Sequence, residues 1–130
     1  MAHPNEDRFR AGYEAFQTGN IDALRTEFLA PDVVWHDPGS GPLSGDHKGI
    51  DEVLANFGKS MEVTGGTFRV ELHDVLANDE HAVALATVSG ERDGKRIEDN
   101  YAHVVHMRDG KVIESWIHQW DPNKVDELLS

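Results

Sequence analysis

The chain has 130 residues, no cysteine, and 24 acidic against 12 basic side chains, for a formal net charge of −12. This length predicts one domain spanning residues 1–130, and the composition excludes disulfides and argues against nucleic-acid or anionic-membrane partners. No apolar run reaches the length of a membrane span, and residues 1–7 lack a signal-peptide pattern, so we expect a cytoplasmic protein.

Helical periodicity dominates the first half of the chain. Between about 5 and 18, one helical face carries Phe9, Tyr13 and Phe16. Gly19 suits the left-handed position that ends a helix, and Asn20 suits the cap of a short second helix. The second helix is expected to direct inward Ile21, Leu24 and Phe28. A third helix is predicted over about 50–62, where apolar residues recur at helical spacing: Ile50, Val53, Leu54, Phe57 and Met61.

Strands are predicted mainly in the second half of the chain. A short strand at 32–35 precedes a loop rich in glycine and proline, and residues 68–73 alternate apolar and polar side chains. Two hairpin signals, Asp93-Gly94 and Asp109-Gly110, predict an antiparallel meander of about 82–91, 96–107 and 112–120. A last short helix over 122–129 is expected to be capped by Asp121. Helices followed by an antiparallel sheet predict an α+β fold whose curved sheet wraps a helix and encloses a pocket.

The candidate general base is Asp37, which stands beside Trp35 where a strand becomes a loop. Desolvation by tryptophans would raise the pKa of this carboxyl toward a value useful for a base. Tyr13 and His103 are the candidate hydrogen-bond donors, so the set could abstract a proton next to a carbonyl and stabilise the enolate. The large aromatics of the last strand are expected to face inward. The predicted substrate contacts are then Trp35, Phe57, Met61, Tyr101, Trp116, His118 and Trp120.

Each candidate also has a structural interpretation. Asp37 precedes a proline and glycines and is equally suited to start a turn through its side chain. Tyr13 is as well explained as a core residue whose hydroxyl meets a backbone carbonyl, and His103 as a buried structural histidine. Trp116 and Trp120, taken alone, are more typical of a core.

No metal or cofactor is predicted, although the chain has eight histidines. His103 and His106 are three apart on a strand and face opposite sides, and His36 and Asp37 diverge for the same reason. The chain also lacks the metalloprotease, phosphate-loop and dinucleotide motifs.

The pattern resembles the cone-shaped α+β superfamily that includes nuclear transport factor 2, ketosteroid isomerase and SnoaL-like polyketide cyclases. The nearest local match is to ketosteroid isomerase, through Asp37-Pro38 and the Gly/Ser/Pro loop that ends in Ser44-Gly45. The resemblance would place the family's base on Asp37 and its oxyanion-hole tyrosine on Tyr13. The family's second oxyanion donor, an aspartate, would fall on His103 or two residues earlier on Tyr101. Asp109-Gly110-Lys111 resembles the Asp-Gly-Lys that precedes the last strand in SnoaL-like proteins. The SnoaL-like group is therefore the better fit within the superfamily.

Three functions compete on this scaffold. The first is an acid/base enzyme, of isomerase, cyclase or dehydratase type, acting on an apolar carbonyl compound. The second is a non-catalytic module that binds a small hydrophobic ligand in the same pocket. The third is an association domain, because relatives commonly form homodimers through the outer sheet face, where we expect the apolar residues Val104, Ile113 and Ile117. A homodimer is compatible with all three functions.

Overall fold

The computed structural model describes residues 3–37, 43–121, 123–124 and 127. Its helical elements are α1 (Pro4–Thr18), α2 (Ile21–Ala23), the π-helical turn η1 (Leu24–Phe28) and α3 (Ile50–Val63). Its strands are β1 (Leu29–Asp37), β2 (Gly45–Lys48), β3 (Arg69–Ala77), β4 (His81–Arg92), β5 (Lys95–Arg108) and β6 (Lys111–Gln119). The Gly/Pro loop 38–42 and most of the predicted helix 122–129 lie outside the described residues. No described helix is long and apolar enough to cross a membrane.

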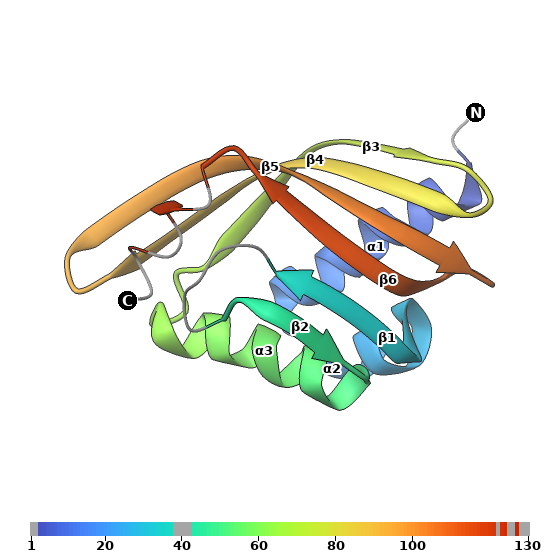
Figure 1. Ribbon diagram of the computed structural model, residues 1–130, viewed down its shortest axis with the longest axis horizontal. Coiled ribbons are helices and arrows are strands. Elements are labelled where there is room, and N and C mark those ends of the chain that lie inside the picture. The colour runs from blue at the N-terminus through green and yellow to red at the C-terminus, as the bar shows by residue number, and fades with distance from the viewer. Residues whose placement is uncertain (1–2, 38–42, 122, 125–126, 128–130) are drawn as a thin grey trace.

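The described strands form one mixed sheet in the order β2-β1-β6-β5-β4-β3. Only the β1–β6 pair is parallel, and the other neighbours are antiparallel. Figure 1 shows α1 running beneath the long strands while α3 lies alongside β1 and β2. The two helices meet through Phe16 and Phe57, whose ring centroids are 5.2 Å apart. This is the predicted cone-shaped α+β fold, with the core between the helices and the concave face of the sheet.

The two hairpin predictions are confirmed. Both central residues of each turn have positive φ: Asp93 and Gly94 at 52° and 79°, Asp109 and Gly110 at 54° and 77°. Turns of this kind match the right-handed twist of the flanking strands, which is why the Asp-Gly pairs fix the register of β4, β5 and β6.

The predicted helix boundary at Gly19 and Asn20 is also confirmed. Gly19 adopts φ 74°, and the Asn20 side chain accepts a hydrogen bond from the Ala23 backbone. The expectation for the next turn was partly wrong, because Ile21 is exposed while Leu24 is buried. The π-helical turn holds an extra residue per turn, so a simple 3.6-residue period does not describe which side chains of 21–28 point inward.

A bulge in β6 overturns the expected orientation of the last strand. Its register against β5 shifts between His106 and Met107, so both Val112 and Ser115 face the core. Ile117 therefore faces inward, contrary to its expected place on the outer sheet face. The three residues of this last segment that were expected in the pocket lie outside it. Trp116 stacks on His36 at 5.4 Å, His118 is exposed, and Trp120 keeps 85% of its surface exposed.

Strand β2 was not predicted, and the preceding strand, β1, is longer than the predicted 32–35. β2 pairs with β1 so that His47 lies opposite Trp35, on the inner face that also carries Asp37. On the outer face, His36 lies 2.6 Å from Asp46 and 2.8 Å from Glu114, which ties β2, β1 and β6 together. These two carboxylates raise the pKa of the His36 imidazole. The predicted divergence of His36 and Asp37 is thus confirmed.

Candidate functional site

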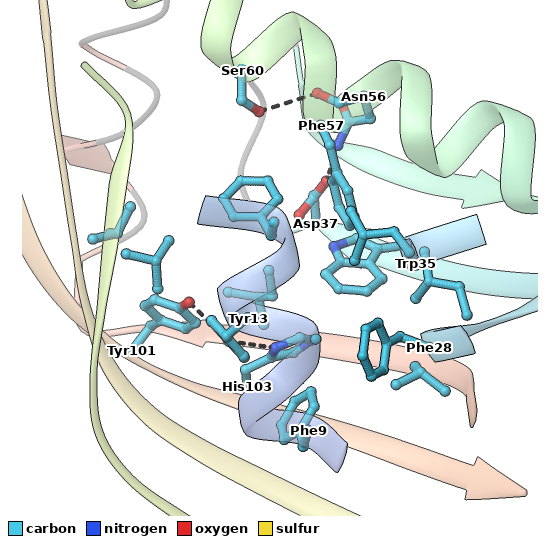
Figure 2. Close-up of a pocket in the computed structure, with 18 of the residues that line it drawn as sticks. Phe9, Tyr13, Phe28, Trp35, Asp37, Asn56, Phe57, Ser60, Tyr101 and His103 are labelled. Carbon is cyan, nitrogen blue, oxygen red and sulfur yellow. Dashed lines mark hydrogen bonds between the residues drawn. The ribbon is translucent and has the colours of Figure 1, made fainter. Parts of the chain in front are cut away.

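The candidate site is a cavity of about 160 Å³ between α1, α3 and the concave face of the sheet. Most of its wall is apolar and aromatic, with Phe9, Phe16, Phe28, Trp35, Phe57 and Phe68 among the lining residues. Two groups of polar side chains interrupt this wall. Figure 2 shows Asp37 and Asn56 together near α3, whereas Tyr13, Tyr101 and His103 cluster further along the cavity.

The Asp37 carboxylate closes one side of the cavity from the end of β1. Its Oδ2 atom accepts a hydrogen bond of 2.7 Å from Asn56 Nδ2 and lies 3.3 Å from His47 Nε2. Burial raises the pKa of the Asp37 carboxyl to about 6, against the opposing effect of His47 and of hydrogen bonds from Asn56 and Trp35. The expected desolvation of this carboxyl is therefore present in the structure.

His47 supports Asp37 from β2. Its Nε2 atom lies 3.0 Å from the carbonyl oxygen of Leu43 as well as 3.3 Å from Asp37. Because both of these neighbours only accept hydrogen bonds, Nε2 must carry a proton and donate it toward them. The imidazole thus holds the carboxylate in place whether or not Nδ1 is also protonated.

Asn56 and Ser60 belong to the inner face of α3. They stand three and seven residues after the buried Val53, and the Ser60 hydroxyl donates to the Asn56 carbonyl (Figure 2). Neither residue was predicted from the sequence, and neither was His47. Asn56 and Ser60 could have been found from the sequence, because they are polar side chains that interrupt the apolar stripe of a predicted helix.

The second polar group is a chain of hydrogen bonds from β6 to the cavity. The Tyr13 hydroxyl lies 2.9 Å from the Tyr101 hydroxyl and 2.6 Å from His103 Nδ1, and His103 Nε2 lies 2.5 Å from Ser115 Oγ. Burial lowers the pKa of His103 to about 3, so the imidazole is neutral at neutral pH. Burial likewise raises the pKa of both tyrosines, which stay protonated.

One arrangement of the protons of this chain leaves only the Tyr101 proton, at the cavity end, without an acceptor among the described residues. A neutral imidazole donates from one nitrogen and accepts at the other. Among the described residues, the Ser115 hydroxyl has only His103 as a hydrogen-bond partner, and Ser115 is fully buried. Ser115 therefore donates to Nε2, His103 donates from Nδ1 to Tyr13, and Tyr13 donates to Tyr101. The Tyr101 proton is then left to point into the cavity.

The structure brings together six of the predicted site residues. The cavity lining includes the three proposed catalytic residues, Asp37, Tyr13 and His103, and three of the proposed contacts, Trp35, Phe57 and Tyr101. Met61 is not among the described lining residues, and Ser60 takes the corresponding position on α3. Trp116, His118 and Trp120 were expected here and lie elsewhere, because of the β6 bulge. The described part of the chain holds no cluster of three or more potential metal ligands.

Together, this fold and this cavity define the class of cone-shaped proteins typified by nuclear transport factor 2. An NTF2-like protein from Burkholderia xenovorans superposes with a TM-score of 0.84 at 19% identity, over 100% of this chain and 98% of that one. A Jannaschia protein named as a putative SnoaL-like polyketide cyclase superposes with a TM-score of 0.80 at 19% identity, over 98% of this chain and 92% of that one. At these identities the likeness shows the fold alone.

Within this class, the chain belongs to the SnoaL-like domain family, whose model matches residues 9–115. It is 34% identical over 107 residues to the uncharacterized protein Rv0034 of Mycobacterium tuberculosis, covering 82% of this chain and 81% of that protein. It is also similar to Bal32a, from a soil-derived mobile gene cassette, with a TM-score of 0.94 at 35% identity over 99% and 98% of the two chains.

Proposed function

We propose that this protein is an acid/base enzyme of isomerase, cyclase or dehydratase type that acts on an apolar carbonyl compound. The observation that carries the proposal is the Asp37 carboxylate, which shares one apolar cavity with the Tyr13–Tyr101 hydroxyl pair. A cavity with a buried carboxylate at one side and a hydrogen-bond donor at another is suited to proton transfer beside a carbonyl group.

Asp37 is the proposed base. With a pKa of about 6 it is mostly ionised at neutral pH, yet it is basic enough to take a proton from carbon activated by a carbonyl. In this step the C–H bond breaks, the proton moves to the carboxylate, and the electron pair passes to the carbonyl oxygen as an enolate. For an isomerisation, the protonated Asp37 returns the proton to another carbon of the substrate.

Tyr101 is the proposed donor to the enolate oxygen, because its proton is the one that the hydrogen-bond chain leaves for the cavity. Tyr13 lies directly behind it. His103 has both nitrogens engaged, by Tyr13 and Ser115, so it acts through Tyr13 rather than by touching the substrate. His103 is thus a positioning residue, which refines its expected role as a direct donor.

The test is hydrogen exchange at carbon, which needs no knowledge of the natural product. Cyclohex-3-en-1-one in D2O reports both deuterium uptake beside the carbonyl and migration of its double bond by NMR. We expect the protein to accelerate one or both, and Asp37→Asn to reduce the acceleration by more than about tenfold. Asp46→Asn is the matched control, since Asp46 belongs to the same β1–β2 hairpin but lies on the outer face. Equal rates for the Asp37→Asn variant and the unchanged protein would refute the assignment of the base.

The second candidate is a non-catalytic module that holds an apolar ligand, and the aromatic wall of the cavity favours it. It predicts saturable binding of small ketones without deuterium uptake or bond migration. The expected homodimer and cytoplasmic location stay predictions, and the outer face offers fewer apolar residues for a dimer than expected because Ile117 faces inward.

A further inference from the structure

We propose that the site takes a neutral, monocyclic carbonyl compound, and that it rejects carboxylates, phosphates, coenzyme A esters and tetracyclic ligands. This inference rests on the proposed function for the role of the carbonyl group. It follows from the charges of the lining residues, the volume of the cavity and the placement of its two polar groups.

Among the described lining residues, no cation is free to hold an anionic ligand. Arg8 is the one arginine or lysine among the described lining residues. Its Nε atom donates to the Gly110 carbonyl at 3.0 Å, its Nη2 atom donates to the Glu27 carbonyl, and its guanidinium lies 5.2 Å from the centroid of the Phe28 ring. The guanidinium is thus used to join α1 to η1 and to the β5–β6 turn.

The buried His103, which also lines the described part of the cavity, is equally unsuited to hold an anion. Burial keeps His103 neutral by lowering its pKa to about 3. An anionic ligand would therefore lose its hydration without gaining a partner, and would also be repelled by Asp37. We therefore infer that the site does not take ligands whose binding depends on a carboxylate or phosphate group of their own.

The volume limits the ligand to about one ring. The cavity measures about 160 Å³, close to the roughly 150 Å³ of an engineered apolar protein cavity that binds benzene. A tetracyclic skeleton would need the aromatic wall to open. Trp35 and Phe57 lie on one side of the cavity and Tyr101 on the other (Figure 2), and we infer that a six-membered ring with small apolar substituents occupies the space that they line.

The polar groups fix the orientation of such a ligand. A carbonyl oxygen at Tyr101 accepts the one proton that the hydrogen-bond chain offers to the cavity. The ring then extends along the apolar wall toward Asp37. A hydrogen on a ring carbon activated by the carbonyl is thereby brought toward the carboxylate, as the proposed proton transfer requires.

Three probes test this inference. Carvone is a neutral monocyclic ketone, perillic acid has nearly the same skeleton with a carboxylate, and androst-4-ene-3,17-dione is a tetracyclic diketone. Binding is followed by Trp35 fluorescence in a Trp116→Phe/Trp120→Phe background, since those two tryptophans lie outside the cavity, and by the shift in thermal midpoint of the unchanged protein.

We expect saturable binding of carvone, with at least about tenfold weaker binding of ionised perillate at pH 8 and of the steroid. Perillate that binds as tightly as carvone would overturn the charge argument. A steroid that binds more tightly would overturn the size limit, and no binding of carvone up to its solubility would overturn the inference as a whole. Carvone that binds without any deuterium uptake would instead refute the catalytic proposal and leave the ligand class intact.

Discussion

The phenolic oxygen of Tyr13 lies 2.6 Å from Nδ1 of His103, although the two residues are 90 positions apart in the chain. This contact joins α1 to β5 inside an otherwise apolar core. It gives each partner the hydrogen bond that a buried polar group needs. Through the Tyr13 hydroxyl it also connects His103 to the hydroxyl of Tyr101. A structural and a functional interpretation of these residues therefore apply together.

The two tyrosines are expected to differ in what their hydroxyls contribute. Tyr101→Phe removes the donor at the end of the chain, so it should lower the carbon-exchange rate about tenfold or more. It leaves one buried partner, the Tyr13 hydroxyl, without an acceptor, so its loss of stability should be smaller than that of Tyr13→Phe, which leaves two partners without their hydrogen bonds. Tyr13→Phe also strands buried partners and should in addition lower the free energy of unfolding by about 1–3 kcal/mol. Exchange rates and urea denaturation measured on both variants separate the two effects. A Tyr101→Phe protein with the unchanged rate would exclude this hydroxyl as the donor.

The His103 tautomer is a direct check on the direction of the proton chain. The arrangement that satisfies Ser115 places the proton on Nδ1 and leaves Nε2 as an acceptor. Nitrogen-15 NMR of the His103 ring should therefore show a pyridine-type Nε2 at neutral pH. In Ser115→Ala the preference for this tautomer should weaken, because Nε2 loses its donor. A protonated Nε2 in the unchanged protein would reverse the proposed direction.

The dependence of stability on pH should reveal the buried Asp37 carboxyl. Its folded pKa of about 6 lies above the ordinary aspartate value of 3.8, so the folded state binds more protons between these values and gains stability as the pH falls. Two pKa units correspond to about 3 kcal/mol. The difference in unfolding free energy, Asp37→Asn minus unchanged protein, should thus rise by about that amount between pH 4 and pH 7. A difference independent of pH would mean that the carboxylate is solvated.

His103 contributes to the pH dependence of the unfolding free energy with the opposite sign to Asp37. Its folded pKa of about 3 lies below the ordinary value of 6.5, so the unfolded state binds more protons and stability is lost as the pH falls through this window. Between about pH 4 and pH 6 the two groups should nearly cancel in the unchanged protein. Asp37→Asn removes one side of this balance, so its own stability should fall with acidification by about 1.4 kcal/mol per pH unit.

His47 is expected to set the pKa of Asp37. Its electrostatic interaction with Asp37 and its hydrogen bond to Asp37 both lower the pKa of the carboxyl against the larger effect of burial. His47→Phe should therefore move the Asp37 pKa upward from about 6, which a carbon-13 titration of the carboxyl would detect without any substrate. His118→Phe is the matched control, because His118 is exposed on β6. An Asp37 pKa that is the same in His47→Phe as in the unchanged protein would refute the proposed effect of His47 on this carboxyl.

The predictable part of this protein depended on signals that are local in the chain. The Asp-Gly turns, the cap at Asn20 and the period-2 pattern of β5 each reflect backbone or packing preferences within a few residues. Because side chains of a strand alternate, Tyr101 and His103 could be assigned to one face and were found there, both buried. The position of Asp37 at the end of a strand followed in the same way.

Only the tertiary structure decided which side chains share the cavity. A bulge is a feature of two paired strands, so nothing within β6 alone indicated that Ser115 and Ile117 would face inward and Trp116 outward. Likewise, His47 and Asn56 meet Asp37 because β2 and α3 return to the end of β1. The sequence by itself determined the order of elements and the chemistry available. Long-range pairing determined how that chemistry was assembled, since contacts between distant residues depend on register that no local pattern encodes.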